Sequence, residues 1–331
     1  MTYNIPDENT PKPPGQTRPY PQPTTTGEID FKVPTTGEQV KTAYKIWGTL
    51  SPTTTPLICL HGGPGMLHNY ILPISLLATD TPTPVIMYDQ LGCGLSTHLR
   101  HHNSSPEFWT SALFIAELEN LKSALGISSF HILGQSWGGM LAAQYVIEVQ
   151  PPGLRKLVIC NSPANLTTWA KVCTALREAL PVEVREVLDR CEREGTTDGK
   201  EYQEATYAFY RRHVCRVDPF PEELVASLEG VAEDNTVYGT MNGPSEFTVV
   251  GSLKGWDITP GLGKISEEAV PGGVLLVNGK WDEAQDETME PFEKGIGARV
   301  KWVRFGLSSH TPMLEETEGF LVALREFLEE E

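Results

Sequence analysis

The segment GQSWG at residues 134–138 has the G-x-S-x-G pattern that presents a serine nucleophile on a sharp strand-to-helix turn. An apolar run precedes it and a helix-like segment with small residues follows it, which is the context that this pattern requires. The glycines let strand and helix approach closely, and the helix N-terminus favours developing negative charge. We therefore predict that Ser136 is a nucleophile; the alternative is a Gly-rich turn with a structural serine.

A second glycine-rich segment, HGGPG at residues 61–65, follows the apolar run PLICL. Serine hydrolases with a G-x-S-x-G turn take one oxyanion-hole amide from a loop at this position and another from the residue after the nucleophile. We assign these two amides to Gly63 and Trp137, since glycine permits close backbone approach to a substrate. The alternative for HGGPG is a simple tight turn.

A serine hydroxyl is a weak nucleophile unless a base accepts its proton, and the chain order expected here is Ser, then Asp or Glu, then His. Only His310, which follows the last apolar run, has the required position among the eight histidines. For the acid we choose Asp282, in the NGKWD segment after the apolar run GVLLV. Asp286 and Asp257 are competitors, and each acid alone could be a solvated surface carboxylate in so acidic a chain.

Short apolar, β-branched runs alternate with helical patterns along the chain, which is typical of a parallel sheet covered by helices. The predicted strands are 56–60, 85–88, 130–133, 157–160, 273–277 and 300–305. The predicted helices that cover them are 106–125, 138–149 and 319–328. Together with the serine motif, this order indicates an α/β-hydrolase fold with a mostly parallel central sheet.

The domain organisation follows from breaks in this alternation. Residues 1–27 are rich in proline and threonine and predict an extended N-terminal arm that lies on the surface. Residues 166–230 have helical spacing and no convincing central strand, so they predict an inserted helical cap. We therefore expect an α/β-hydrolase core at 28–162 and 262–331, with the cap at 163–261.

Charge and cysteine usage exclude several classes of function. The 331 residues carry a formal net charge of −17 without a Lys/Arg-rich stripe, so we expect no nucleic-acid partner, and a cationic substrate group is favoured. The six cysteines occur singly, which argues against a zinc site or a disulfide framework. No signal peptide or membrane-spanning apolar run is present, so we expect a cytoplasmic protein with no membrane partner.

No motif for a cofactor is found in the sequence. The GCG segment after residue 91 lacks the third glycine of a dinucleotide fingerprint, and no lysine completes a P-loop. His98, His101 and His102 are of metal-ligating type, but a solvated loop is the favoured interpretation. We predict neither a metal ion nor an organic cofactor.

Taken together, HGGPG, DQLGCGLS (89–96) and GQSWGG resemble the proline iminopeptidase family of serine peptidases, and within it the tricorn-interacting aminopeptidases. The resemblance extends to YQEA (202–205), MNGPSEF (241–247) and GWDIT (255–259). It implies the same catalytic triad of Ser136, Asp282 and His310. It also implies that two glutamates bind the free α-amino group of the substrate, namely Glu246 in the NGPxEF motif and Glu283 directly after the triad aspartate.

The leading hypothesis is therefore a serine aminopeptidase or amidase that releases an N-terminal residue, proline or small and apolar, from peptides or amino-acid amides through an acyl-enzyme. The first alternative is an esterase or amidase of a specialised metabolite, in which an inherited amine site is reused. The second, from a different class, is a non-catalytic hydrolase-like binding protein whose proline-rich arm recruits a partner. The sequence leaves the preferred first residue and the oligomeric state open.

Overall fold

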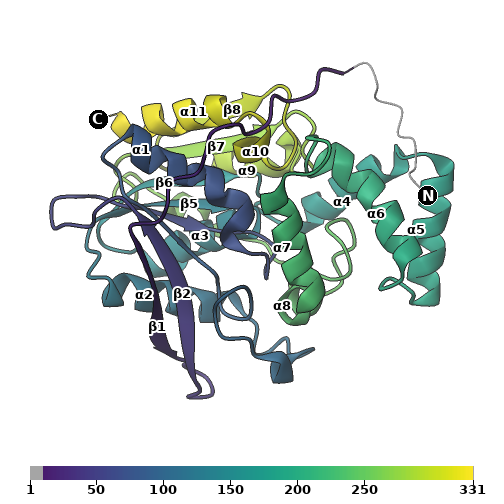
Figure 1. Cartoon of the computed structure of the whole chain (residues 1–331), viewed down its shortest axis with the longest axis horizontal. Coiled ribbons are helices and arrows are strands. Elements are labelled where there is room, and N and C mark those ends of the chain that lie inside the picture. Colours follow the sequence, from purple (N-terminus) through teal and green to yellow (C-terminus); the bar gives the residue numbers. More distant parts are fainter. Residues whose placement is uncertain (1–9, 331) are drawn as a thin grey trace.

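The computed structural model describes residues 10–330. An eight-stranded sheet forms the centre of the molecule (Figure 1). Its strand order is β1-β2-β4-β3-β5-β6-β7-β8. The β1–β2 and β2–β4 pairs are antiparallel and all other pairs are parallel, which confirms the mostly parallel sheet of the α/β-hydrolase fold. The strands are β1 (Thr25–Lys32), β2 (Gln39–Trp47), β3 (Leu57–Leu60), β4 (Val85–Tyr88), β5 (Phe130–Gln135), β6 (Leu154–Cys160), β7 (Val274–Gly279) and β8 (Val300–Phe305).

Helices cover both faces of this sheet because its central strands are apolar on both sides. In β3, for example, Ile58 and Leu60 belong to one hydrophobic cluster, whereas Leu57 and Cys59 belong to a second cluster on the opposite face. The helices that contribute to the first cluster include α2 (Ser111–Ala124), α3 (Trp137–Val149) and α9 (Asp286–Gly295). Those of the second cluster include η1 (His68–Leu76), α1 (Leu77–Asp80), α10 (Pro312–Glu315) and α11 (Thr317–Glu329).

The two antiparallel strands at the sheet edge are absent from the sequence prediction. β1 is mostly exposed, with buried Phe31 near its end, so its apolar residues are too few to produce a clear alternating pattern. β1 begins at Thr25, and the last three residues of the predicted arm, 25–27, therefore belong to the sheet.

The rest of the described arm, residues 10–24, runs along the surface and is held there by polar contacts. The indole Nε1 of Trp47 donates to the carbonyl oxygen of Pro21 at 2.9 Å. Arg18 forms a bidentate ion pair with Asp80, in which its two terminal guanidinium nitrogens lie 2.8 and 2.6 Å from the two carboxylate oxygens. Residues 1–9 of the predicted arm lie outside the described residues.

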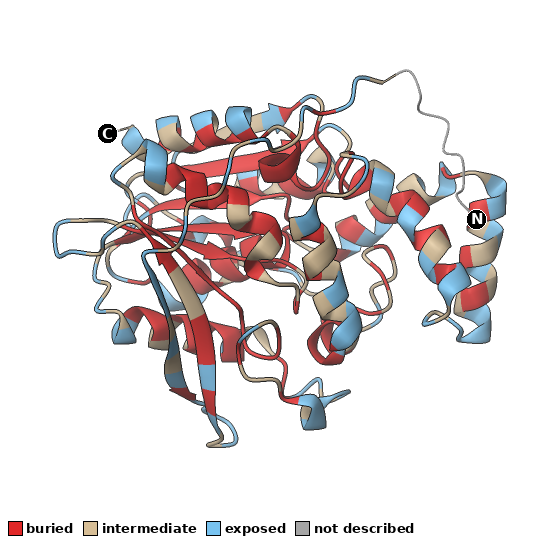
Figure 2. Cartoon of the chain, in the orientation of Figure 1, coloured by how far each residue is buried: buried red, intermediate tan, exposed pale blue. Residues whose placement is uncertain are grey.

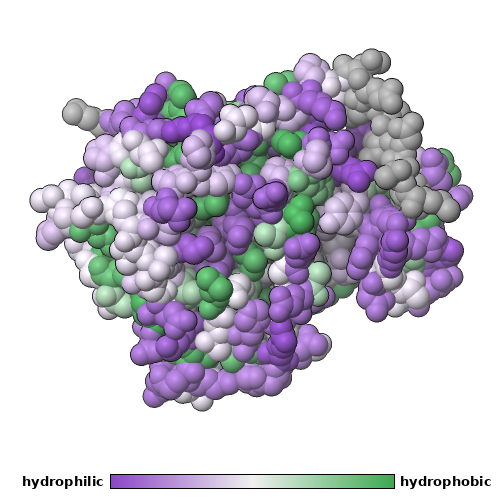
Figure 3. All heavy atoms as spheres, in the orientation of Figure 1, coloured by the Kyte–Doolittle hydropathy of each residue, from purple (hydrophilic) through white to green (hydrophobic). Residues whose placement is uncertain are grey.

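A group of helices lies between β6 and β7, in the part of the chain for which the sequence predicts a helical insertion. They are α4 (Leu166–Glu178), α5 (Val182–Glu194), α6 (Lys200–His213), α7 (Glu222–Glu233) and α8 (Thr236–Met241), with η3 (Thr259–Lys264) before β7. α5 and α6 extend to one end of the molecule, with buried faces toward each other and exposed, mainly hydrophilic outer faces (Figures 2 and 3). Among the described residues, no helix has the length and apolar character needed to cross a membrane.

Candidate active site

The predicted nucleophile lies on a strained turn at the carboxyl end of β5, immediately before α3. Ser136 has φ 54° and ψ −121°, a backbone conformation that a residue with a side chain rarely adopts. A Cβ atom on Gly134 would overlap with the backbone carbonyl of Gly138, so only glycine allows the strand and helix to meet in this way. The strained turn directs the Ser136 side chain to a cavity at this edge of the sheet.

The predicted acid and base are in direct contact. His310 Nδ1 lies 2.7 Å from Asp282 Oδ1, and Asp282 is fully buried. The backbone N–H of Ala284 also donates to Oδ1, at 2.8 Å, while the Asn161 amide donates to Oδ2 at 2.5 Å. Because these donors stabilise an ionised Asp282, the imidazole is oriented with Nδ1–H toward the carboxylate and with Nε2 available as a base.

The competing acids take other positions. Asp286 accepts hydrogen bonds from Arg304 and Asn278 at the surface, and Asp257 accepts them from Thr259. Neither contacts His310, so among the three acids the structure brings only Asp282 to the imidazole.

Ser136 and His310 line the same cavity, at the carboxyl ends of the parallel strands. The hydrogen bonds of the described residues do not include one between Ser136 Oγ and the imidazole. The arrangement is therefore that of a serine, an acid and a base in this chain order, with the serine and the base at one cavity.

Both predicted oxyanion-hole residues lie next to Ser136. Gly63 lines the cavity with a φ of 112°, which favours glycine, and Trp137 is the first residue of α3. Within the described residues, the backbone N–H groups of Gly63 and Trp137 donate no hydrogen bond to a loop, a helix cap or a side chain. Two uncommitted amides beside a nucleophile provide the donors that an oxyanion requires.

A buried network that the sequence did not reveal joins the oxyanion loop to the loop that carries the base. The Tyr70 hydroxyl accepts a hydrogen bond from the Gly62 N–H at 2.6 Å and donates to Gln135 Oε1 at 2.5 Å. Gln135 Nε2 in turn donates to the carbonyl oxygen of His310 at 2.9 Å. Tyr70 and Gln135 therefore connect the loop that carries Gly63 to the loop that carries His310, the predicted base.

Gln90 fixes the other side of the oxyanion loop. Its backbone N–H donates to Nε2 of His61, and its side-chain Nε2 donates to the His61 carbonyl oxygen, both at 2.9 Å. Its Oε1 accepts the indole N–H of Trp137, also at 2.9 Å. The loop before Gly63 and the residue after Ser136 are thus connected through one buried amide side chain.

The buried carboxylate of Glu315 holds the residues on both sides of His310. It accepts hydrogen bonds from the backbone and hydroxyl of Ser309, at 2.8 and 2.9 Å, and from the backbone of Thr311 at 3.2 Å. The backbone N–H of Arg216, which follows α6, donates to the same carboxylate at 2.8 Å. Burial raises the pKa of Glu315 to about 7, although these hydrogen bonds lower it.

The two glutamates implied by the family resemblance meet at the same cavity. Glu283 is fully buried, and neither of its carboxylate oxygens has a hydrogen-bond partner; Oε1 lies 3.7 Å from His310 Nε2. Glu246 accepts one hydrogen bond, from the Tyr238 hydroxyl at 2.7 Å. Burial raises the pKa of both carboxyl groups, and the negative charges of Glu246 and Asp282 raise that of Glu283 further. A buried carboxylate without a partner is costly unless a cation binds there.

The inserted helices position Glu246. The indole N–H of Trp169, in α4, donates to the backbone carbonyl of Glu246 at 2.9 Å. The Tyr202 hydroxyl, in α6, lies 3.2 Å from the Ser245 hydroxyl, and the Asn242 amide donates to the Ser245 carbonyl at 3.1 Å. The NGPxEF segment is therefore held by two helices and by its own turn.

Apart from Gln135 and Thr311, the remaining side chains that line the cavity are apolar or aromatic. They come from the loop before η1, from η1, from α6 and the residue after it, and from α7: Met66, Tyr70, Tyr210, Val214, Leu224 and Leu228. No lysine or arginine is among the described residues that line the cavity. The cavity thus combines the predicted nucleophile, two carboxyl groups and an apolar wall.

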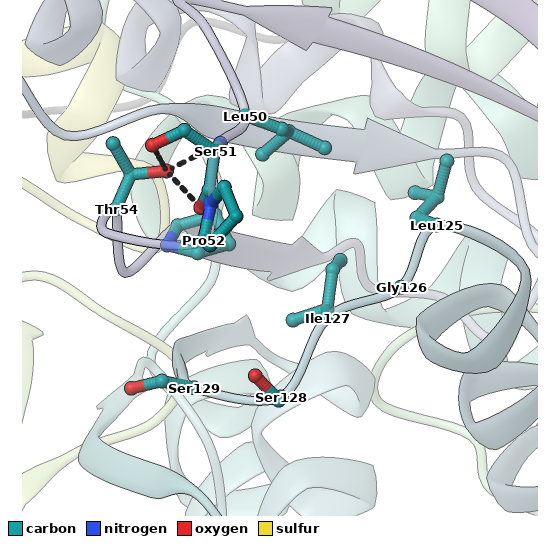
Figure 4. Close-up of a pocket in the computed structure, with 10 residues that line it drawn as sticks. Leu50, Ser51, Pro52, Thr54, Leu125, Gly126, Ile127, Ser128 and Ser129 are labelled. Carbon is teal, nitrogen blue, oxygen red and sulfur yellow. Dashed lines mark hydrogen bonds between the residues drawn. The ribbon is translucent and has the colours of Figure 1, made fainter.

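A larger cavity, of about 340 Å³, lies at the opposite edge of the sheet, before β3 and β5 (Figure 4). It is formed by the loops at residues 50–56 and 125–129, and the side chains of Ser51 and Thr54 are hydrogen-bonded to each other there. The described residues that line it include no titratable side chain. It therefore lacks the groups for acid–base or nucleophilic chemistry.

The three histidines considered as metal ligands do not meet. His98 Nδ1 lies 2.5 Å from Asp234, the residue after α7, and its Nε2 lies 3.1 Å from the Gly94 carbonyl. His101 and His102 instead share the carboxylate of Glu38, at 2.8 and 2.9 Å. Glu38 comes from the turn between β1 and β2, so these two histidines hold that turn to the loop before α2.

Comparison with known proteins places this chain in a family. Residues 55–191 match the family model described as alpha/beta hydrolase fold. The proline iminopeptidase of Heyndrickxia coagulans is 36% identical over 274 residues, which cover 83% of this chain and 90% of that protein. The proline iminopeptidase of Thermoplasma volcanium is 35% identical over 82% of this chain and 88% of its own length.

Solved structures agree. The crystal structure of a proline iminopeptidase from Mycobacterium smegmatis superposes with a TM-score of 0.80 at 42% identity, covering 92% of this chain and 97% of that one. The crystal structure of VinJ superposes with a TM-score of 0.86 at 40% identity, covering 93% and 99% of the two chains. The chain therefore belongs to the proline iminopeptidase family of α/β-hydrolase enzymes.

Proposed function

We propose that this enzyme is a serine aminopeptidase that releases an N-terminal residue, proline or small and apolar, from peptides or amino-acid amides. The observation that carries the proposal is the buried carboxylate of Glu283, which has no hydrogen-bond partner and lies beside His310 and Glu246. An α-ammonium group supplies positive charge to both carboxylates and the hydrogen-bond donors that Glu283 lacks. A neutral ester or an acidic substrate does not.

Acylation begins when the Ser136 hydroxyl attacks the carbonyl carbon of the first residue while His310 Nε2 takes its proton. The carbonyl oxygen becomes an oxyanion, which accepts hydrogen bonds from the backbone N–H groups of Gly63 and Trp137. Asp282 holds the imidazole in the required tautomer and stabilises the imidazolium. When the tetrahedral intermediate collapses, the imidazolium protonates the leaving amine and the C–N bond breaks.

Deacylation uses the same groups in reverse. His310 removes a proton from water, which attacks the acyl carbon, and the ester bond to Ser136 breaks as His310 returns the proton to the serine oxygen. The free amino acid leaves. Each step is served by side chains and backbone amides of this chain, so the proposal includes no metal ion or organic cofactor.

The carboxylate pair accounts for removal of one residue only. When Glu246 and Glu283 fix the free amine in the cavity that contains Ser136, the first carbonyl is the one within reach of the nucleophile. A substrate with a blocked amine loses both the charge and the positioning. The acyl-enzyme therefore carries a single amino acid.

A release assay with proline, alanine and leucine arylamides tests the proposal. We expect turnover of at least one free-amine arylamide and no detectable turnover of its N-acetylated counterpart. Turnover of simple esters without turnover of any free-amine substrate contradicts the proposal. That result supports the alternative of a metabolite esterase.

We also propose a cytosolic location. All six cysteines are buried free thiols, in keeping with a reducing compartment. Fractionation of cells that produce the protein tests this, and recovery of the enzyme outside the cytosolic fraction contradicts it.

A further inference from the structure

We propose that Glu38, His101 and His102 form a binding site for a divalent transition-metal ion, with zinc as the favoured occupant. The site lies apart from the catalytic cavity, since none of the three residues lines that cavity. The ion connects the turn between β1 and β2 to the loop before α2, and it takes no part in the proposed reaction. Its binding therefore does not depend on the aminopeptidase function.

The three side chains provide a donor set of two imidazoles and one carboxylate. His101 and His102 are consecutive residues of the short helix η2 (Arg100–His102). Their Nε2 atoms lie 2.8 and 2.9 Å from the two carboxylate oxygens of Glu38. In the sequence these histidines group with His98, and a solvated loop is the favoured interpretation. The structure replaces His98 by a carboxylate that lies 63 residues before His101.

The spacing of these atoms is close to that of ligands around one ion. One ligand atom from each residue lies within 4.8 Å of the other two, and among the described residues this is the one group of three metal-ligating side chains so arranged. Zinc binds imidazole nitrogen and carboxylate oxygen at about 2.0–2.2 Å, so two ligands of a tetrahedral ion lie about 3.4 Å apart. The side chain of His101 is 61% exposed and can rotate to reach this spacing.

The type of donor selects the class of metal. Imidazole nitrogen suits zinc, nickel and copper, whereas magnesium and calcium prefer ligands that are all oxygen. Three protein ligands leave further coordination positions of the ion to water. Zinc is therefore the favoured occupant, and magnesium serves as the negative comparison.

Glu38 is an ionised carboxylate without a permanently charged partner. Hydrogen bonds from His102, Thr36 and His101 lower its pKa to about 2, so it is ionised at neutral pH. Its ion-pair partners among the described residues are the two histidines, and no lysine or arginine pairs with it. A neutral imidazole supplies a donor but no charge. In a chain with a formal net charge of −17, such a position attracts a cation.

Neighbouring contacts orient the ligands in advance. The ring of His102 stacks on Phe108, with ring centres 3.6 Å apart, and its backbone carbonyl accepts the indole N–H of Trp109 at 2.9 Å. The Thr36 hydroxyl donates to Glu38 Oε2 at 2.7 Å. Because these groups are already held, metal binding requires little further ordering of the side chains.

Metal binding changes the position of one proton on each ring. An ionised carboxylate only accepts hydrogen bonds, so each Nε2 carries a proton when it contacts Glu38. When Nε2 gives its lone pair to the metal, a neutral imidazole carries its single proton on Nδ1, and a protonated imidazole releases one proton to solvent. In the part of the chain that the structure describes, Nδ1 of neither His101 nor His102 forms a hydrogen bond that opposes this change.

Calorimetric titration of the full, metal-free chain with zinc chloride tests the site. We expect one saturable zinc site per chain and no comparable binding of magnesium. Loss of a residue that merely supports a metal ligand commonly lowers affinity 10- to 100-fold, so loss of a ligand should cost at least about tenfold. We expect this loss in Glu38→Gln and in His101→Ala. Saturating zinc should also raise the melting temperature of the wild type, because the ion binds the folded chain.

Two variants serve as matched controls. Glu28→Gln removes a carboxylate of β1 that pairs with Lys41, and His98→Gln removes an imidazole of the same loop that pairs with Asp234. Neither residue belongs to the proposed site. Both variants should bind zinc as tightly as the wild type and should retain the rise in melting temperature.

The outcomes are decisive in both directions. Zinc binding that Glu38→Gln and His101→Ala weaken at least tenfold, and that the controls leave unchanged, supports the site. Absence of saturable binding shows that the three side chains form a hydrogen-bonded clamp only, and the inference is then wrong. Smaller losses, or equal losses in the controls, also overturn it; inhibition of arylamide hydrolysis by zinc in Glu38→Gln would then place the ion beside His310 and Glu283.

Discussion

Replacement of Glu283 by glutamine tests the proposed contribution of this carboxylate to amine binding. The side chain keeps its size in a fully buried position, so packing changes little, but its charge is lost. A hydrogen bond to a charged group contributes about 1.5–3 kcal/mol, which corresponds to a loss of about 10- to 150-fold in kcat/KM for alanine or proline arylamides.

The same variant should behave differently toward a substrate without an amine. For a simple acyl ester we expect kcat/KM within about threefold of the wild type, because Ser136, His310 and Asp282 remain in place. Glu287→Gln is the matched control: Glu287 lies in the first turn of α9, is exposed and is absent from the cavity lining. It should leave both activities unchanged.

Steady-state kinetics with arylamide and ester substrates, together with melting temperatures, distinguish amine binding from general damage. Equal losses toward both substrates would refute the reasoning, since they would place Glu283 in the chemical step or in folding. Unchanged arylamide kinetics would refute it too, because a carboxylate that contacts the ammonium cannot be removed without effect.

Three further predictions concern other parts of the site. Tyr70→Phe removes the hydroxyl that connects the predicted oxyanion loop to Gln135. The lost hydrogen bonds correspond to about 1–3 kcal/mol, so we expect kcat to fall about tenfold while KM stays within twofold of the wild type. An effect on stability alone would lower the melting temperature and leave kcat unchanged. Gly134→Ala forces a Cβ into the Gly138 carbonyl, so we expect insoluble protein or destabilisation by at least about 3 kcal/mol in urea unfolding, and wild-type stability would contradict the turn geometry. Because burial and neighbouring charge raise the pKa of Glu283, its carboxylate form is lost as pH falls through a value above the usual range, and arylamide kcat/KM should decline there. Glu246→Gln removes one of those charges and should shift this acid limb to lower pH; an unshifted limb would assign it to another group.

The Ser, Asp and His positions could be predicted from chemistry and chain order, because each follows a strand and the carboxyl ends of parallel strands meet at one edge of the sheet. The sheet and its covering helices follow from the same alternation. The roles of Glu246 and Glu283 came only from the family resemblance, since an isolated glutamate in a chain with 43 acidic residues carries no signal of burial. The structure supplies that signal as a fully buried carboxyl group, that of Glu283, and a partly buried one, that of Glu246, at one cavity.

The supporting residues could not be predicted because their partners are distant in the chain. Tyr70 and Gln135 are 65 residues apart, and Gln135 and His310 are 175 apart, so no local pattern marks their contacts. Glu117 lies within a predicted helix, and no local pattern marks it as buried. In the structure it is fully buried and accepts hydrogen bonds from the Thr42 hydroxyl and from the backbone N–H of Leu91. Burial raises its pKa to about 7. Such positions depend on tertiary packing, which composition and periodicity do not encode.

Labelling of Ser136 by a fluorophosphonate, measured in parallel with aminopeptidase activity, tests the central claim most directly. We expect stoichiometric modification that peptide mapping assigns to Ser136, loss of arylamide hydrolysis in proportion to labelling, and protection by an amino-acid amide. Modification of Ser136 with retained arylamide hydrolysis, or full activity in Ser136→Ala, would contradict the account.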